Sequence, residues 1–202
     1  MKVAYNDEYF KDNNFDYWNA RNKRFFRKKQ LKLVSDFFDF SRKVLDVGCA
    51  SNPLNKALPE LNVTATDLYF EGDGVIKADV YKLPFENNSI EQIYCWCLLE
   101  HLHGPEKAMK ELNRVLKKGG RILLSTEMPH RDFYTKDKTH VKPFTQKELR
   151  ELFESRGFRI KKIEKEIYYF KGISWLPFEI SYFIGRALDF LSSIIVVKAE
   201  KT

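Results

Sequence analysis

Residues 43–53, which read KVLDVGCASNP, decide the fold of this chain. The stretch begins as an apolar run of strand-forming residues and changes at Gly48 to small and turn-forming residues. A short helical segment is expected to start over residues 54–58, with Ser51 or Asn52 as its N-cap. A strand, a glycine turn and a helix in this order are typical of the opening of a nucleotide-binding βαβ unit.

The turn also indicates which kind of ligand it can approach. A glycine-rich loop such as G-x-G-x-x-G lets backbone N–H groups cradle a pyrophosphate. This turn contains one glycine, Gly48, and the carboxylate of Asp46 comes shortly before it. A pyrophosphate therefore fits poorly, whereas a buried acid at this point suits a ligand that carries a positive ammonium group.

Residues 43–53 resemble motif I of the class I S-adenosylmethionine (SAM) methyltransferases of the small-molecule type, which is usually close to V-L-D-x-G-C-G-x-G. The resemblance implies SAM as the cofactor, with Asp46, Gly48, Cys49 and Ala50 in contact with it. Ala50 departs from the motif, because the family usually has its second glycine there. Alanine adds one methyl group, which the turn can accept if φ at this residue is negative.

The next strand, residues 62–67, ends in the carboxylate of Asp67. Ligands of doubly wound sheets lie at the carboxyl ends of the strands, and a carboxylate about twenty residues after the glycine turn can accept the ribose hydroxyls. Spacing and resemblance thus favour ribose binding by Asp67, and Leu68 and Tyr69 are expected to lie against the adenine. A turn-forming role is the alternative for this aspartate.

Two further segments resemble the same family. Residues 78–85 resemble x-D-x-x-x-L-P-F, which implies that Asp79 accepts a hydrogen bond from the adenine amino group and that the Val80 N–H serves a ring nitrogen. Residues 111–126 resemble E-x-x-R-V-L-K-P-G-G-R-L-x-x-S-T, which is the most specific supporting match after motif I.

Residues 89–102 resemble S-F-D-x-V followed by V-L-E-H-L, which implies that Cys95 and Trp96 stand at the strand end that faces the methionine part of SAM. Thiols and a histidine could gather near this strand end, namely Cys49, Cys95, Cys97 and His101. A zinc site would need such ligands in a tetrahedral array, but the chain has no C-x-x-C pair and free cysteine commonly behaves as a small buried hydrophobe. We therefore predict no metal site and reduced thiols.

The resemblance spans about residues 17–199 and implies an α/β fold. It is a three-layer Rossmann-like sandwich, with a seven-stranded, mostly parallel sheet whose last strand is antiparallel. We expect a single domain over 1–202, with an N-terminal arm and capping helix over 1–40 and a helical insertion over 171–191 before the last strand. The residues of the capping helix that the resemblance places near SAM are Tyr17, Trp18 and Arg21.

Local signals place the remaining elements. Pro105 starts a helix, which residues 117–120 are expected to end with positive charge and a glycine cap. Thr145 and Glu148 form a capping box at the start of a helix over residues 146–156. The last three strands are expected over residues 121–126, 159–170 and 193–199.

The acceptor of a methyl group must in many cases lose a proton, and a base with a near-neutral pKa removes it best. Histidine meets this condition. His140 and His130 lie on the loop where the family's acceptors bind, and His101 follows the fourth strand. These three are the candidate catalytic bases, with His140 favoured over His130.

The 202 residues carry a net charge of +7, and 44% are hydrophobic, which is ordinary for a globular protein. Much of the positive excess lies in residues 21–32, a helix face that is either simply solvated or able to bind nucleic acid. The N-terminus has no apolar signal segment, which favours a cytoplasmic protein. Residues 173–191 are apolar but too often charged to span a membrane, which leaves peripheral membrane contact open.

We expect a SAM-dependent methyltransferase that acts on a small-molecule acceptor. The apolar insertion before the last strand favours a lipophilic or aromatic acceptor. Two alternatives stay open: an RNA methyltransferase that uses the basic helix over 21–32, and a catalytically degenerate SAM-binding or partner module.

Overall fold

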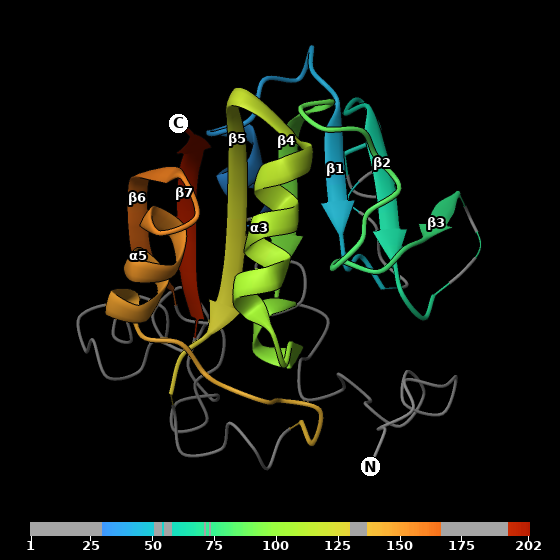
Figure 1. The fold of residues 1–202 in the computed structure, drawn as a ribbon. Coiled ribbons are helices and arrows are strands. Elements are labelled where there is room, and N and C mark those ends of the chain that lie inside the picture. Colours follow the sequence, from blue (N-terminus) through green and yellow to red (C-terminus); the bar gives the residue numbers. More distant parts are fainter. Residues whose placement is uncertain are drawn as a thin grey trace, which may run out of the picture.

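The computed structural model of the chain describes residues 30–50, 54, 58–70, 72, 74–129, 137–166 and 194–202. These residues form a seven-stranded sheet with helices packed against it (Figure 1). The strands are β1 (Val44–Val47), β2 (Val63–Asp67), β3 (Val75–Lys77), β4 (Ile90–Trp96), β5 (Leu116–Glu127), β6 (Phe158–Glu166) and β7 (Ile194–Lys201). The helical elements include the 3₁₀ helix η3 (Leu99–His101), α3 (Pro105–Val115) and α5 (Gln146–Glu154).

The strand order in the sheet is β3-β2-β1-β4-β5-β7-β6. Strands β1 to β5 pair in parallel, whereas β7 lies between β5 and β6 and is antiparallel to both. The prediction of a Rossmann-like sheet with an antiparallel last strand is confirmed. The strand order reverses between β1 and β4, and the carboxyl ends of strands at such a switch point are where this architecture places its ligands.

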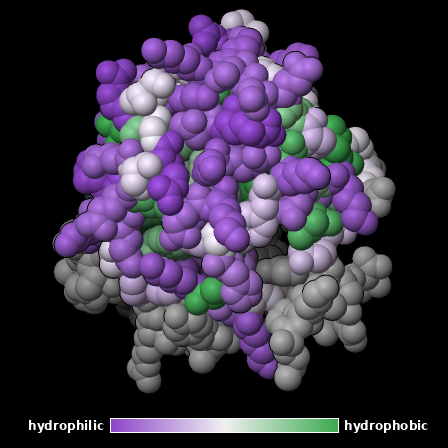
Figure 2. Space-filling model, viewed as in Figure 1, coloured by the Kyte–Doolittle hydropathy of each residue, from purple (hydrophilic) through white to green (hydrophobic). Residues whose placement is uncertain are grey.

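Apolar side chains pack on both faces of the sheet, so the molecule has three layers. On one face, α3 and α5 lie over the sheet (Figure 1), and Met109 and Phe153 contribute to their fully buried sides. On the other face, Val34 and Phe38 pack against Tyr94 and neighbouring strand residues. Figure 2 shows that the outer side of the first helical layer is mostly hydrophilic, as expected for amphipathic helices that bury one face.

Helix α3 begins at Pro105 as predicted, but it ends at Val115, before the predicted glycine cap. Leu116 is already extended and starts β5, five residues before the predicted start of that strand. The ammonium group of Lys201 satisfies the helix end instead, because its Nζ donates to the carbonyl oxygens of Asn113 at 2.7 Å and of Leu116 at 2.9 Å. A cation at this position also opposes the negative end of the helix dipole.

Other element boundaries also differ from the sequence expectations. The predicted capping helix, expected to run to about residue 40, is helical over 30–35 in its described part and ends there. The helical segment after the glycine turn starts with a bond of 3.0 Å from the Leu58 N–H to the Leu54 carbonyl oxygen. Its expected N-cap, Ser51 or Asn52, lies outside the described residues.

The described part of the predicted sixth strand is β6, which runs to Glu166, and the last strand is confirmed as β7. The expected insertion over 171–191 and the basic residues 21–29 lie outside the described residues. Within the described ranges, no helix has the length and apolar character needed to cross a membrane.

The capping box at the start of α5 is confirmed, and it gives a testable pH dependence. The Glu148 N–H donates to Thr145 Oγ1, while a Glu148 carboxylate oxygen accepts from the Thr145 N–H at 2.8 Å. Bonds from Lys142 and from the Thr145 backbone lower the pKa of Glu148 to about 2. We expect Glu148→Gln to lower the free energy of unfolding by about 1 kcal/mol at pH 7. This value is smaller than the shift in pKa alone would give, because solvent screens the partly exposed carboxylate.

A carboxylate with a depressed pKa stabilises the fold above its unfolded-state pKa and loses that effect as the pH falls through the folded value. The difference in free energy of unfolding between wild type and Glu148→Gln should therefore begin to shrink as the pH falls below about 4.3, the ordinary pKa of glutamate. It should nearly vanish near pH 2. Urea unfolding across this pH range measures it. Glu151→Gln on the same helix is the control, since its side chain is 66% exposed and lies 4.0 Å from Lys147. An equal loss in both variants would contradict the capping role.

Candidate functional site

The carboxylate of Asp46, at the end of β1, lies under the glycine turn and is only 2% exposed. Its Oδ2 accepts a hydrogen bond of 2.7 Å from the Leu54 N–H, so it fixes the start of the following helical segment. The N–H groups of Gly48 and Cys49 both donate to the Thr66 carbonyl oxygen, at 2.8 and 3.1 Å. The turn is thereby held between β1 and β2 at the carboxyl edge of the sheet.

Gly48 has a φ of +73°, which L-residues with side chains rarely adopt. A Cβ atom at this position would lie 3.0 Å from both Cδ atoms of Leu98, so a side chain there would also force the Leu98 side chain to shift by a few tenths of an ångström. Leu98 belongs to the segment that joins β4 to η3. The glycine turn and this segment are therefore in direct contact.

The condition under which the turn accepts alanine easily, a negative φ, is not met, because Ala50 has a φ of +48°. Its N–H donates to Asp67 Oδ2 at 2.9 Å. The turn keeps the left-handed conformation that suits a second glycine, and alanine adopts it at a cost of about 1–2 kcal/mol. The bond to Asp67 is one of the interactions that offset this strain.

We expect Ala50→Gly to raise the free energy of unfolding by about 0.5–1 kcal/mol. Glycine relieves the left-handed strain, and part of this gain is offset by the greater freedom of the unfolded chain. Urea unfolding measures the change. Ala78→Gly is the matched control, because φ at Ala78 is not positive and glycine there should cost about 0.5–1 kcal/mol. A similar loss in both variants would contradict the account of strain at Ala50.

The Asp67 carboxylate at the end of β2, which binds the Ala50 N–H, also stabilises the turn that follows β2. Its Oδ1 accepts from the N–H groups of Tyr69 at 2.8 Å and of Phe70 at 2.9 Å. The turn-forming role weighed for this residue is therefore present in the structure. Leu68 and Tyr69 are 40% and 51% exposed, which leaves a large apolar surface beside the carboxylate. A carboxylate has about four acceptor positions, so three N–H donors leave one for a ligand hydroxyl.

Asp79 follows β3 and lies next to this turn, because the Ala78 N–H donates to the Asp67 carbonyl oxygen at 2.8 Å. Its Oδ1 accepts from the Tyr81 N–H at 2.8 Å, and its side chain is half-buried. The Val80 side chain is 8% exposed and packs in the core. The predicted adenine contacts at Asp79 and Val80 thus lie on one edge with Asp67.

Cys95 and Trp96 at the end of β4 point to opposite faces of the sheet. Cys95 is 1% exposed and packs in the core with Val47, and its thiol pKa is raised mainly by burial. The Trp96 ring stacks on Tyr94 at a centroid distance of 5.7 Å. The structure therefore places the Cys95 side chain in the core rather than at the ligand edge. All three cysteines of the chain are described and none forms a disulfide.

Several predicted site residues lie outside the described residues. They are Tyr17, Trp18, Arg21 and His130. Their cofactor and catalytic roles stay predictions.

A second group of polar side chains surrounds η3 at the same edge, and Glu100 is its most buried member. The Glu100 side chain is 0% exposed, and its Oε2 accepts from Thr126 Oγ1 at 2.8 Å. Among the described residues, its Oε1 has no hydrogen-bond partner. Burial raises the pKa of Glu100 to about 7, and contacts with the Thr126 hydroxyl and the Cys97 thiol counter this only in part.

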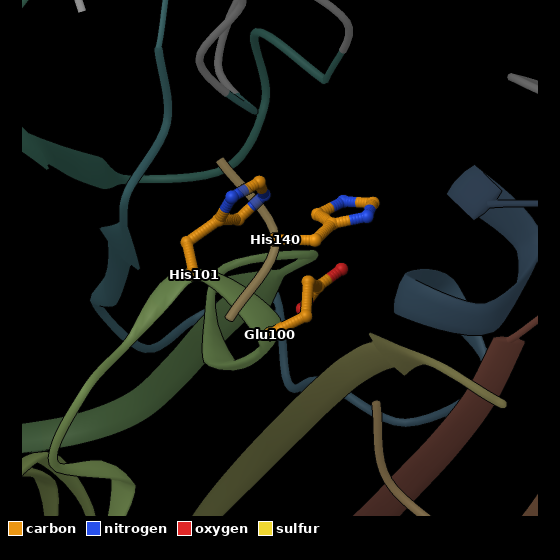
Figure 3. A group of neighbouring side chains, drawn as sticks. All are labelled: Glu100, His101 and His140. Carbon is orange, nitrogen blue, oxygen red and sulfur yellow. The ribbon is translucent and has the colours of Figure 1, made fainter. Parts of the chain in front are cut away.

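His101 and His140 face each other beside Glu100, with ring centroids 4.8 Å apart (Figure 3). Burial and the neighbouring His140 lower the pKa of His101 to about 4, so this imidazole is neutral at pH 7. His140 Nδ1 lies 3.9 Å from Glu127 Oε2 at the end of β5. The structure thus brings together two of the three predicted catalytic histidines.

Three side chains that hold this group together were not predicted from the sequence, namely Glu100, Thr139 and Asp137. Thr139 Oγ1 lies 2.8 Å from His101 Nδ1 and donates to Asp137 Oδ1 at 2.6 Å. The N–H groups of Val141 and Lys142 donate to the Glu100 carbonyl oxygen. No periodic pattern marks these residues. Only the adjacent Glu-His pair after a predicted strand could have drawn attention to them.

Comparison with known proteins identifies the family. A family model described as a methyltransferase domain matches residues 17–163, which is more than half of the chain. The crystal structure of a SAM-dependent methyltransferase from Archaeoglobus fulgidus superposes with a TM-score of 0.70 over 97% of this chain and 100% of that chain, at 18% identity. That likeness shows the shared fold.

Two relatives match part of the chain. Sterol 4-C-methyltransferase strm-1 from Caenorhabditis elegans is 27% identical over 54% of this chain and 32% of its own length. A ubiquinone biosynthesis O-methyltransferase from Dechloromonas aromatica is 30% identical over 42% of this chain and 44% of its own length. The matched region thus spans less than half the length of either relative. With the motif I turn, the strand order and the family match, the chain belongs to the class I SAM-dependent methyltransferases.

Proposed function

We propose that this chain transfers a methyl group from SAM to a small-molecule acceptor, with SAM held at the carboxyl edge of β1, β2 and β3. The observation that carries the proposal is the Asp67 carboxylate. It fastens the motif I turn through the Ala50 N–H and keeps an acceptor position beside two exposed apolar side chains. This arrangement suits a ligand that combines a ribose with a flat apolar ring.

The residues of the edge fit such a ligand by their chemistry. Asp67 would accept a ribose hydroxyl, Leu68 and Tyr69 would cover the adenine, and Asp79 would accept from its amino group. Asp46 lies under the turn and supplies a negative charge toward an ammonium group. When bound, SAM supplies a methyl group that is already activated by its positive sulfur.

The protein's part in the reaction is then mainly to place the acceptor and exclude water, since holding two reactants in the right geometry lowers the barrier by several kcal/mol. The polar group around η3 adjoins the cofactor edge, because Leu98 lies against Gly48. His140 and Glu127 are the residues of this group on the loop side. In the proposed reaction they would contact the acceptor and take part in the transfer of its proton.

The acceptor class is supported by two observations. By their names, one of the relatives acts on a sterol and the other acts in ubiquinone biosynthesis. Sterols and ubiquinone are lipophilic small molecules. The apolar segment expected before β7 would add a lipophilic wall, although it lies outside the described residues. We therefore propose a lipophilic or aromatic acceptor.

The test is transfer of label from methyl-labelled SAM into a cell extract, followed by separation of organic-soluble, RNA and protein fractions. We expect the label in the organic-soluble fraction, and we expect Asp67→Ala to remove most of it. His103→Gln, an exposed histidine close in sequence to the η3 group, is the control and should retain activity. Label in the RNA fraction would support the nucleic-acid alternative and overturn the proposed acceptor class.

A further inference from the structure

The carboxylate of Glu100 lies in an unusual environment. Its side chain is fully buried, yet among the described residues Oε1 accepts no hydrogen bond. An unsatisfied buried polar atom costs about 1–3 kcal/mol, and more when it is charged. Such an atom calls for an explanation, and one common explanation is an ion that the polar group binds.

The two imidazoles beside Glu100 supply further ligand atoms. One ligand atom from each of Glu100, His101 and His140 lies within 4.8 Å of the others. Figure 3 shows the Glu100 carboxylate directed toward His140, with His101 on the other side of the group. Ligand atoms of a tetrahedral site are about 3.3 Å apart, so small side-chain rotations would bring these three into coordination distance.

The hydrogen bonds around His101 leave one of its ring nitrogens as an electron-pair donor. The Thr139 hydroxyl has one proton, which it donates to the Asp137 carboxylate. Toward His101 this hydroxyl can only accept, so His101 Nδ1 carries the ring proton. His101 Nε2 then holds the lone pair. A ring N–H bonded to a chain that ends in a carboxylate is the arrangement that commonly orients a metal-ligating histidine.

We propose that Glu100, His101 and His140 bind one divalent transition-metal ion at the carboxyl edge of the sheet, with coordination positions left open. Imidazole nitrogens with one carboxylate oxygen suit ions such as Zn²⁺ or Co²⁺ better than Mg²⁺, which prefers oxygen ligands. Sites with three protein ligands keep a position for water or substrate.

The proposal replaces the sequence expectation that the chain has no metal site. That expectation concerned a zinc site formed by the cysteines together with His101, and the structure does not support such a thiolate site. Cys95 is packed in the core, and burial together with the Glu100 charge raises the pKa of Cys97 well above its usual value. Neither thiol readily becomes the thiolate that would bind a metal.

The consequence for catalysis rests on the proposed function. With an ion bound, His140 is a ligand and not the general base expected from the sequence. The open positions would take an acceptor that offers oxygen or nitrogen donors and lower the pKa of an acceptor hydroxyl. Glu127, whose carboxylate lies 3.9 Å from His140 Nδ1, becomes the nearby group that can receive the proton.

The test is titration of the full chain, stripped with a chelator, with Co²⁺ followed by visible absorption and with Zn²⁺ followed by calorimetry. We expect one ion per chain and a d–d absorption band typical of a low-coordinate site. Glu100→Gln, His101→Gln and His140→Gln should each weaken Co²⁺ binding by at least tenfold, and Thr139→Val by about 10- to 100-fold through loss of the bond that orients His101.

His103→Gln is the matched control and should leave Co²⁺ binding unchanged, because His103 is exposed and is not one of the three grouped ligands. Circular dichroism confirms that each variant folds. Co²⁺ binding that is absent in the wild type, or unchanged in all three ligand variants, would overturn the proposal and leave Glu100 as a buried protonated acid. SAM titration of the same samples separates this failure from a failure of the proposed function, since SAM can bind to protein that binds no metal.

Discussion

Asp67→Ala is expected to lower the free energy of unfolding by about 3 kcal/mol. Its carboxylate accepts three backbone N–H bonds, from Ala50, Tyr69 and Phe70, and alanine offers none of them an acceptor. Water can replace the acceptor at the exposed Tyr69 N–H, so the loss is smaller than the sum of three charged bonds. Urea unfolding measures the change. Asp67→Asn keeps one amide oxygen as an acceptor and should lose less.

The same variant should weaken SAM binding by about 1–3 kcal/mol, which corresponds to about a 5- to 150-fold higher Kd. The physical reason is the lost hydrogen bond to the ribose together with the looser motif I turn. Asp36→Ala is the control, since Asp36 is an exposed partner of Lys32 at 3.0 Å and lies away from the edge. Unchanged SAM affinity in Asp67→Ala, measured below its unfolding transition, would refute the ribose assignment.

Arg114→Met is expected to cost about 3 kcal/mol of unfolding free energy. The guanidinium holds the chain before β4 against α3. Its Nε and Nη2 each lie 2.8 Å from Glu111 oxygens, and Nη1 donates to the Phe85 carbonyl oxygen at 2.8 Å. Nη2 also donates to the Leu83 carbonyl oxygen at 3.1 Å. Methionine keeps the apolar stem and leaves these acceptors, including the ionised Glu111, without a donor.

A double-mutant cycle separates the ion pair from the carbonyl bonds. Glu111→Gln alone should cost less than Arg114→Met, and the two losses should not add, because the residues share their interactions. Arg150→Met on α5 is the control, since its pair with Glu154 is 3.5 Å long and about half exposed. Ordinary surface substitutions change the free energy of unfolding by less than about 0.5 kcal/mol. A loss below this value in Arg114→Met would contradict the proposed role of Arg114 in holding the chain before β4 against α3.

The sequence was sufficient for the features that depend on local chemistry. The apolar strand before Gly48, the start of α3 at Pro105 and the capping box of Thr145 and Glu148 all follow from residues close together in the chain. The seven-stranded, mostly parallel sheet with an antiparallel last strand followed from the family resemblance, and the structure confirms it.

The features that could not be predicted depend on contacts between distant residues. Lys201 ends α3 from the far end of the chain, so no local pattern shows it. The positive φ at Ala50 is imposed by the turn and by the bond to Asp67, against the preference of alanine. The group of Glu100, His101 and His140 combines residues of η3 with a residue of a distant loop. Only folding brings His140 beside Glu100.

The central claim is that SAM binds at the carboxyl edge organised by Asp67, and calorimetric titration with SAM and with S-adenosylhomocysteine tests it most directly. We predict one site per chain with a Kd of roughly micromolar order for both ligands, within the range of common enzyme substrates. A Kd for SAM that rises by about 5- to 150-fold in Asp67→Ala and stays unchanged in Asp36→Ala would support the site as described. No binding of either ligand by the folded wild-type chain at about millimolar concentration would contradict the account.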